Sequence, residues 1–538
     1  MKIAGNLVDV SAEEIYPAEI TFKEKILKIK KVNKKYKNFI LPGFIDAHIH
    51  IDSSMLCPSR FGEVVVPHGT VAVITDPHEI ANVMGMDGIN YMISDSTTPL
   101  KIFFTAPSCV PATPYETSGA ILESREIEKL MRYKQVVALG EVMNYPAVIC
   151  GDKKMITKIN IAKKYNKPID GHCPNLSGKA LKKYVSYVIS TEHECSTLKE
   201  AQEKANLGMQ IMIRDGSAAK NMEALINLKQ ENSFIVSDDK HPIDLTRGHI
   251  NLMLKKAVSL GMDPIKAIKK VTLNPAQHYK LNFGLIEPGK DANLIEVDDL
   301  KNFNVKRVTI DGKLVARNGK PLFKVKPKLA PLNIKIKQKE PQDFDIVCKK
   351  SENKVKVRVI QTVENQLFTK ELIRSLNIKN KKILIDIKRD VLKIAVVERY
   401  GHEKIALGFI KGFNLKKGAI ASSIAHDSHN IVVIGTNEED MAKAVNLTAK
   451  YGGLVAVCKD KSLHVKLPIA GLMTDKRADV VSVELKKIHD FTRKLGCNLY
   501  APFMAMSFMC LTATPEINIT DKGLIDTRNF RFVNVIVK

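Results

Sequence analysis

The sequence predicts an α/β protein whose central part is a (β/α)8 barrel of the TIM type. Two observations support this prediction. Eight short apolar segments alternate with helical segments over residues 39–280, and such alternation is typical of parallel β-α units. The length of about 240 residues also suits eight units. We therefore expect residues 39–280 to form the barrel domain.

Strand-rich segments flank the predicted barrel on both sides. Residues 1–38 contain short alternating stretches such as Lys25–Lys30, and residues 281–320 contain strands around an Asp311-Gly312 hairpin turn. Because a small sheet needs a partner to be stable, we expect the two flanks to join into one composite β-sandwich domain.

Within the barrel, each apolar segment is expected to be a buried strand. The predicted strands are Phe44–Ile45, Val71–Thr75, Ile102–Thr105, Val136–Gly140, Ile169–Gly171, Ser186–Ser190, Met209–Ile213 and Phe234–Val236. The predicted helices between them include Met155–Tyr165, Lys179–Tyr184, Thr197–Leu207 and Ala218–Lys229.

Beyond the second flank the sequence changes character twice. Residues 321–343 carry four prolines among lysines and are expected to be a linker. Residues 344–538 are expected to form a C-terminal α+β domain. Its predicted elements are strands at Lys382–Ile387, Leu392–Glu398, Ile431–Gly435 and Leu454–Val457, and helices at Glu438–Lys450 and Val481–Leu495.

Charge and cysteine content restrict the class of protein. The net charge is +25, which can indicate nucleic-acid binding. The lysines are spread along the chain, however, and the chain has no RNA-binding motif, so we do not expect that function. Nine cysteines without a Cys-x-x-Cys pair favour a reducing compartment. With no signal-like or membrane-spanning apolar segment, a cytoplasmic location is expected.

A His-x-His pair follows the first predicted strand. His48 and His50 stand two residues apart, so their side chains fall on the same face of the strand, and neutral imidazole is a common metal ligand. Two ordinary histidines at a strand end are the simpler alternative. Asp46 and a Pro-Gly turn precede the pair, and further histidines and carboxylates follow later strands. That pattern favours a metal site.

The later residues of this kind also stand where predicted strands end. In a parallel barrel these ends meet at the catalytic edge. The histidines and carboxylates at these positions are His78 and Glu79 after the second strand, Glu141 after the fourth, His172 after the fifth, His193 after the sixth and Asp238 after the eighth. Among all these candidates, the four imidazoles of His48, His50, His172 and His193 and the two carboxylates of Glu141 and Asp238 suit Zn, Mn, Fe or Co. Because six ligands exceed one tetrahedral ion, two ions that activate a water for hydrolysis are expected.

At this point the sequence resembles a known family. Residues 41–50, Leu-Pro-Gly-Phe-Ile-Asp-Ala-His-Ile-His, are similar to the opening signature of the amidohydrolase superfamily. Within it, the chain resembles the adenine deaminases of bacterial and archaeal type. The matching stretches are Asp46–Ser54, Thr75–Asn82, Gly140–Asn144, Asp170–Cys173, Glu192–Glu194, Ser237–Asp239 and Ile424–Asn430.

This resemblance implies hydrolysis of adenine to hypoxanthine and ammonia in purine salvage or adenine catabolism. His48 and His50 would bind the first metal ion, and His172 and His193 the second. Glu141 would bridge both ions. Asp238 would bind the first ion and act as general base, then acid. The cofactor implied is a pair of divalent ions, Mn²⁺ or alternatively Fe²⁺ or Zn²⁺, and a homodimer is compatible with the domain arrangement.

Substrate contacts are less specifically indicated. The candidates are His78, Glu79, Ser108, Asn144, His426, Asp427 and His429. His78 and Glu79 would line the base pocket or bind an accessory metal. Simpler roles stay open for them: a turn residue for His78, backbone caps for Ser108 and Asn144, and a hydrogen-bonded turn or a metal site for the last three.

Two other functions remain as alternatives. One is an amidohydrolase that opens a cyclic amide, like a dihydropyrimidinase or hydantoinase. It predicts a carbamylated lysine where this chain has Glu141. The other is a basic nucleic-acid-binding protein with a degenerate barrel, whose binding would fall steeply with salt and survive chelation.

Overall fold

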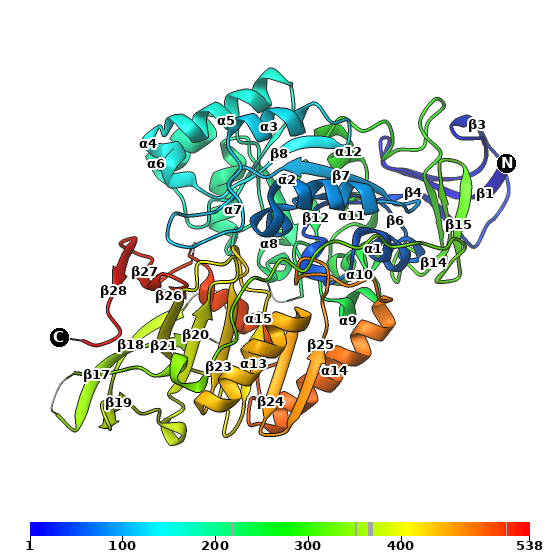
Figure 1. Ribbon diagram of the computed structural model, residues 1–538. Helices are drawn as coiled ribbons and strands as arrows, with labels where there is room; N and C mark the ends of the chain where they lie inside the picture. The colour runs from blue at the N-terminus through cyan, green and yellow to red at the C-terminus, as the bar shows by residue number, and fades with distance from the viewer. Residues whose placement is uncertain (218, 350–351, 364–368, 513, 538) are drawn as a thin grey trace. The chain divides into compact units, whose positions relative to one another are not determined.

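The structure is a computed structural model that describes residues 1–537 except 218, 350–351, 364–368 and 513 (Figure 1). The chain divides into two compact units. Unit 1 consists of Met1–Pro77, Asn90–Ser108 and Leu122–Lys328, and unit 2 of His78–Ile89, Cys109–Ile121 and Leu329–Lys538. Among the described helices, none combines the length and apolar character needed to cross a membrane.

In unit 1, strands from both flanks of the barrel form one eight-stranded sheet. Antiparallel pairing of β4 with β13, from Phe39 opposite Val297 to Pro42 opposite Leu294, joins the two flanks. Leu7, Ile20 and Leu294 belong to the buried core on this sheet. In sheet order the strands are β16 (Lys320–Pro321), β15 (Lys313–Arg317), β14 (Val305–Ile310), β13 (Leu294–Val297), β4 (Phe39–Pro42), β1 (Lys2–Asp9), β2 (Glu14–Phe22) and β3 (Ile26–Lys31).

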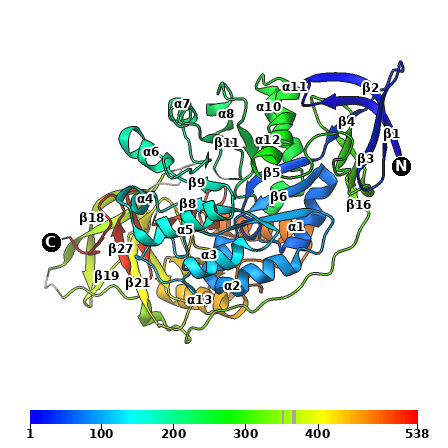
Figure 2. The same cartoon turned by 90° about the horizontal axis from the view of Figure 1, so that it is seen from above.

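The barrel segment of unit 1 contains two parallel sheets, and the larger forms half of a TIM-type barrel (Figure 2). Its strands are β5 (Phe44–Ile49), β6 (Thr70–Thr75), β7 (Lys101–Ala106), β8 (Val136–Val142) and β9 (Ile169–Gly171). The second sheet contains β10 (Thr191–Glu192), β11 (Gln210–Arg214) and β12 (Phe234–Val236). All residues of β5, β6 and β12 are buried, as expected of strands covered on both faces.

Helices alternate with these strands. They are α1 (Pro58–Val65), α2 (His78–Asp95), α3 (Ser124–Met131), α4 (Tyr145–Cys150), α5 (Lys153–Lys164), α6 (Gly178–Val185), α7 (Leu198–Asn206), α8 (Met222–Leu225), α9 (Pro242–Leu245), α10 (Ile250–Ser259), α11 (Pro264–Lys269) and α12 (Leu273–His278). Residues His78–Ile89 of α2 belong to unit 2, and Gly85 breaks the helical backbone with φ 58° and ψ −137°.

Two predicted elements of the barrel are wrong. The strand predicted at Ser186–Ser190 is a turn after α6, and the true strand is Thr191–Glu192. Val188 is 63% exposed and has a φ of 68°, so the apolar run does not continue a buried strand. The helix predicted from Ala218 to Lys229 is reduced to Met222–Leu225, and residue 218 lies outside the described residues. Asn221 stays non-helical because its side chain donates to the carbonyls of His193 and Cys195.

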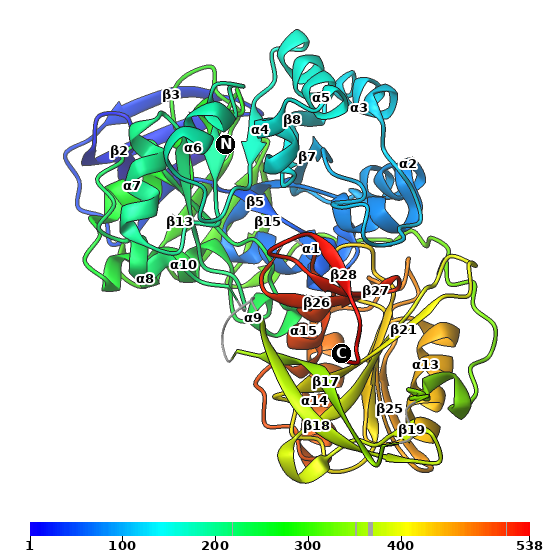
Figure 3. The ribbon, with the colours of Figure 1, turned by 90° about the vertical axis from the view of Figure 1, so that its left-hand side faces the viewer.

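Unit 2 is built on a nine-stranded mixed sheet (Figure 3). In sheet order its strands are β19 (Lys382–Ile383), β18 (Thr369–Lys379), β17 (Lys354–Thr362), β21 (Ile405–Lys411), β20 (Leu392–Val397), β23 (Ile431–Gly435), β22 (Ala419–Ser422), β24 (Leu454–Cys458) and β25 (Lys461–Val465). A small separate sheet contains β26 (Ile517–Thr520), β27 (Gly523–Asp526) and β28 (Arg531–Val533). The helices are α13 (Glu438–Tyr451), α14 (Ala478–Lys494) and α15 (Pro502–Ser507).

Helix α13 shows how local sequence and packing agree in unit 2. Asn437 caps its first turn by accepting from the Asp440 amide at 2.7 Å, and Glu438, Glu439 and Asp440 place negative charge at the positive end of the helix dipole. Its apolar side chains Met441 and Val445 pack against the buried strands of the sheet. The prediction of a helix at Glu438–Lys450 is confirmed to within one residue.

A fully buried arginine holds several segments of unit 2 together. Arg399 is 0% exposed. Its guanidinium donates to four carbonyl oxygens, those of Leu332 at 2.7 Å, Ala470 at 2.8 Å, Asn333 at 3.2 Å and His429 at 3.2 Å. Burial lowers the pKa of Arg399. The side chain therefore connects the linker, at Leu332 and Asn333, to the loop that contains His429.

We expect Arg399→Leu to lower the free energy of unfolding by roughly 2–4 kcal/mol, because buried carbonyl oxygens would lose their donor. A urea titration followed by circular dichroism measures the change. Arg389→Leu is the matched control. Its side chain is 53% exposed and pairs with Asp386 at 2.6 Å, so a loss within about 1 kcal/mol is expected. Equal losses in both variants would contradict the prediction.

Candidate metal centre

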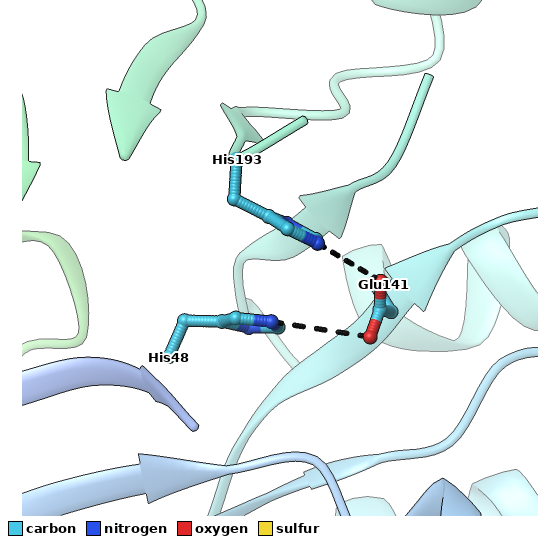
Figure 4. Close-up of side chains that lie close together, drawn as sticks. All are labelled: His48, Glu141 and His193. Atoms are coloured by element: carbon cyan, nitrogen blue, oxygen red, sulfur yellow. Dashed lines mark ion pairs between the residues drawn. The ribbon is translucent and has the colours of Figure 1, made fainter. Parts of the chain in front are cut away.

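Glu141 lies near the carboxyl end of β8, and imidazoles face both of its oxygens. Oε1 is 3.2 Å from His50 Nε2 and 3.9 Å from His48 Nε2. Oε2 is 2.7 Å from His172 Nδ1 and 3.3 Å from His193 Nε2. Figure 4 shows His48 and His193 pointing toward this carboxylate, each at a different oxygen. Each oxygen of this one carboxylate thus faces two histidines.

Asp238 brings a second carboxylate to the same place. Its Oδ1 is 3.2 Å from His50 Nε2 and 3.6 Å from His48 Nε2. The residue follows β12, and its amide donates to the His48 carbonyl at 3.0 Å. Its φ of 55° is uncommon for a residue other than glycine, and such a backbone often marks a functional position.

The donor set fits a divalent metal. The ligand atoms of His48, His50 and Asp238 lie within 4.8 Å of one another, and so do those of His48, Glu141 and His193. All five residues are buried. His48 Nε2 has no hydrogen-bond partner among the residues that the structure describes, which is unusual for a buried ring nitrogen. A cation between these atoms would satisfy it.

The tautomer of His50 also favours metal binding. Its Nδ1 lies 3.1 Å from the carbonyl oxygen of Asp76, which can only accept, so Nδ1 carries the proton. The lone pair is then on Nε2, which faces Glu141 and Asp238. Metal-binding histidines are commonly oriented by such a bond from the other ring nitrogen.

Charges within the site hold both carboxylates ionised. Burial by itself would raise the pKa of Glu141, but His193, His172 and His50 together keep it well below its usual value. Burial opposes ionisation of Asp238 as well, and Arg214 with the neighbouring histidines outweighs it and lowers its pKa. Burial would lower the pKa of His193, yet Glu141 raises it to about 9. Protons therefore compete with cations for this imidazole.

Asp46 is not one of the proposed metal ligands but holds the backbone next to two of them by hydrogen bonds. Its Oδ1 accepts from the amides of His48 at 3.4 Å and Ser237 at 3.1 Å, and its Oδ2 lies 3.1 Å from His249 Nε2. His249 Nδ1 in turn contacts Thr70 Oγ1 at 2.8 Å. Asp46 thus ties the first barrel strand to the segment that carries Asp238.

Arg214 is the main functional residue that sequence reasoning missed. Its guanidinium donates to Asp238 Oδ2 at 2.6 Å and to both oxygens of Glu194, at 2.5 and 3.0 Å. Because Arg214 binds Oδ2 of Asp238, the other oxygen, Oδ1, faces His48 and His50. Arg214 is the last residue of β11, the seventh strand, where no candidate was predicted. The sequence contained one indication of this role, a charged residue at the end of a buried strand.

Two other predicted site residues of unit 1, Ser108 and Asn144, make hydrogen bonds with the protein backbone. Ser108 Oγ donates to the Glu141 carbonyl at 2.7 Å. Asn144 Oδ1 accepts from the Ala147 amide at 3.1 Å and caps α4. Their predicted contacts with a substrate stay predictions.

The remaining candidates all belong to unit 2. Glu79 accepts from His426 Nδ1 at 2.6 Å and is in closer contact with His429 Nε2, and all three residues are buried. His78 Nε2 lies 3.6 Å from Glu79 Oε1. Asp427, between the two histidines in sequence, is also buried. Substrate contact by these five residues stays a prediction.

The tautomer of His429 distinguishes this cluster from the first. Its Nδ1 accepts from the Ala425 amide at 3.2 Å, so the ring proton is on Nε2, the atom that faces Glu79. A metal ion would need the lone pair at Nε2. The arrangement therefore favours a hydrogen-bonded turn held by Glu79 over a metal site, in contrast to His50.

Comparison with known proteins agrees with this description. Residues 39–315 match the model of the Amidohydrolase family, and residues 366–531 match the adenine deaminase C-terminal domain. The chain is 50% identical to adenine deaminase of Methanosphaera stadtmanae, with 100% of this chain and 99% of the relative covered. It is 46% identical to that of Methanothermobacter thermautotrophicus and 44% to that of Borreliella burgdorferi, with 99% of each chain covered in both cases.

Proposed function

Because the chain belongs to the adenine deaminase family of the amidohydrolases, we propose that it hydrolyses adenine to hypoxanthine and ammonia. Similarity over the full length, including the C-terminal domain, carries this conclusion. The catalysed reaction replaces the amino group at C6 of the purine by oxygen from water. The buried cluster of four histidines and two carboxylates supports the same reaction class.

The proposed cofactor is a pair of divalent ions, with Mn²⁺ preferred and Fe²⁺ or Zn²⁺ as alternatives. His48, His50 and Asp238 would hold the first ion, and His172 and His193 the second. Glu141 would bridge them, which is supported by the contacts of its two oxygens with different histidines. When bound, such ions lower the pKa of water toward 7 and so supply hydroxide as the nucleophile.

Asp238 is proposed as the group that moves the proton. Its Oδ1 faces the histidine cluster, and Arg214 restrains Oδ2 at 2.6 Å. The low pKa of the carboxylate keeps it ready to accept a proton from the attacking water. After addition at C6, the same carboxyl would return the proton to the departing amino group, so that ammonia leaves neutral.

We further propose that the two parallel sheets of unit 1 close into a complete (β/α)8 barrel over residues 39–280. The Ser190 amide donates to the Ile169 carbonyl at 2.9 Å, and a parallel bridge pairs Ile49 with Asp238. The proposed domains around it are a composite β-sandwich of 1–38 and 281–320, a linker at 321–343, and a C-terminal domain at 344–538. A cytoplasmic homodimer with no nucleic-acid partner is part of the same proposal.

An assay with adenine tests the function. We expect the Mn²⁺-loaded protein to release hypoxanthine and ammonia in equal amounts, and chelation to reduce the rate to background. Re-addition of Mn²⁺ should restore it, because protein side chains alone would not ionise water at neutral pH. Dihydrouracil and hydantoin serve as controls for the cyclic-amide alternative. Turnover of either, with adenine unchanged, would reject the proposal.

A further inference from the structure

A third carboxylate lies directly beside the two loops that carry His172 and His193. Glu192 is 0% exposed and makes no contact of its own with Glu141 among the described interactions. Its Oε2 accepts from both the amide and the thiol of Cys173 at 2.8 Å, and its Oε1 accepts from the Glu194 amide at 2.6 Å. One side chain therefore binds the residue after His172 and the residue after His193.

A buried lysine completes this arrangement. Lys204, from α7, is also 0% exposed, and its Nζ donates to the Cys173 carbonyl at 2.7 Å and to Glu200 Oε1 at 2.8 Å. It contacts Glu192 Oε2 at 3.2 Å. All three ammonium donors thus have acceptors, and the buried negative charge has a partner, which is what makes burial of both charges tolerable.

We propose that Glu192 is a positioning residue that sets the separation of His172 and His193 for the second metal ion. The proposal rests on the two-ion site proposed above. Cys173 directly follows His172, and Glu194 directly follows His193. The backbone amides of Cys173 and Glu194 both donate hydrogen bonds to the Glu192 carboxylate, so the backbones at the two histidines cannot shift independently. Their nitrogens accordingly meet the same oxygen, Glu141 Oε2, at 2.7 and 3.3 Å.

The chemistry of this position requires a carboxylate. Both oxygens of Glu192 accept hydrogen bonds, from two amides, a thiol and an ammonium group. A glutamine of the same shape offers one oxygen and one NH₂ group. The NH₂ group would face either the Glu194 amide or the donors around Cys173, so one loop would lose its anchor. Metal sites tolerate only small errors in ligand position, about 0.5 Å.

The first experiment compares metal binding by Glu192→Gln and the wild type, with full-length apoprotein titrated with Mn²⁺ and metal content measured by elemental analysis. We expect affinity for one ion to fall about 10–100-fold and the other to be retained. Glu203→Gln is the control. Glu203 lies on α7, next to Lys204. Like Glu192, it accepts a hydrogen bond from a backbone amide, that of Gly178 at 2.8 Å, away from both histidines. Unchanged affinity in Glu192→Gln would overturn the proposal.

A second measurement uses wild-type protein and covers the case in which the variant does not fold. In metal-free protein, hydrogen exchange resolved by fragmentation should find the amides of Cys173 and Glu194 protected, because Glu192 rather than the metal holds them. Exchange as fast as in the exposed turn at Val188 would overturn the proposal. This result does not depend on adenine turnover, so the failure of either proposal can be recognised separately.

Discussion

Asp238→Asn is expected to lower kcat for adenine about 10²–10⁴-fold and to leave most of the bound metal in place. Asparagine keeps the shape of the side chain and one oxygen that can still face His48 and His50. It cannot accept and return a proton, and its NH₂ group would be a poor partner for Arg214, which donates to Asp238 Oδ2 at 2.6 Å. Steady-state hypoxanthine release and metal content by elemental analysis together measure the effect.

Asp263→Asn is a suitable control for that variant. Asp263 caps α11 by accepting from the Lys266 amide at 3.0 Å, and asparagine caps helices equally well. Its kcat should equal that of the wild type. If Asp238→Asn retained normal turnover, Asp238 would not be the proton carrier. If it lost its metal completely, its role would be that of a ligand alone.

Glu141→Gln is the second change with a large expected effect, and it should reduce the occupancy of both ions together. Glu141 is the residue whose two oxygens face different histidine pairs, with Oε1 near His50 and Oε2 near His172 and His193. The variant removes one negative charge from a buried cluster that would hold two dications. We expect turnover to fall at least 10³-fold at low added metal and to recover only in part with excess Mn²⁺.

Metal content per subunit after dialysis distinguishes Glu141→Gln from the positioning variant. Loss of both ions is expected for Glu141→Gln, and loss of one for Glu192→Gln. The control is Glu128→Gln, because Glu128 is a surface residue that pairs with Lys164 at 2.8 Å. Retention of two tightly bound ions in Glu141→Gln would show that Glu141 does not bridge them.

The two histidine clusters illustrate why ring tautomers matter for assigning metal sites. Both place imidazoles around a buried carboxylate, and in both the donor atoms lie within 4.8 Å of one another. In one, His50 Nδ1 donates to a carbonyl and leaves its lone pair toward the carboxylates. In the other, His429 Nδ1 accepts from an amide, so its proton points at Glu79. Residue type and proximity alone would not separate the two.

Several features could be predicted from the chain because they depend on neighbouring residues. An apolar run followed by a histidine or carboxylate places that side chain at the end of a buried strand, and parallel strands end at one edge. This reasoning identified His48, Glu141 and Asp238. In the structure, Nε2 of His48 lies within 4 Å of a carboxylate oxygen of both Glu141 and Asp238. The alternation of strand-like and helical segments likewise predicted β23 and α13.

Short elements were predicted less well because their state depends on distant contacts. The segment Ser186–Ser190, before Thr191, contains the apolar residues expected of a buried strand, but it forms a turn in which Val188 is exposed. The helix expected around residue 220 begins late because Asn221 binds the carbonyls of His193 and Cys195, which lie more than 25 residues earlier. No local pattern reports such bonds.

The order and spacing of residues thus determined which side chains stand at strand ends, because strand positions follow from backbone periodicity. The chemical types of those side chains, imidazoles and carboxylates, indicated the reaction class. Only the tertiary structure decided which charges hold those side chains in place. Arg214 against Asp238, and Lys204 with Glu192 behind His172 and His193, pair residues from different strands and helices. Such pairs form because a buried charge needs a partner wherever the fold can supply one, and the neighbouring sequence does not identify which residue that partner is.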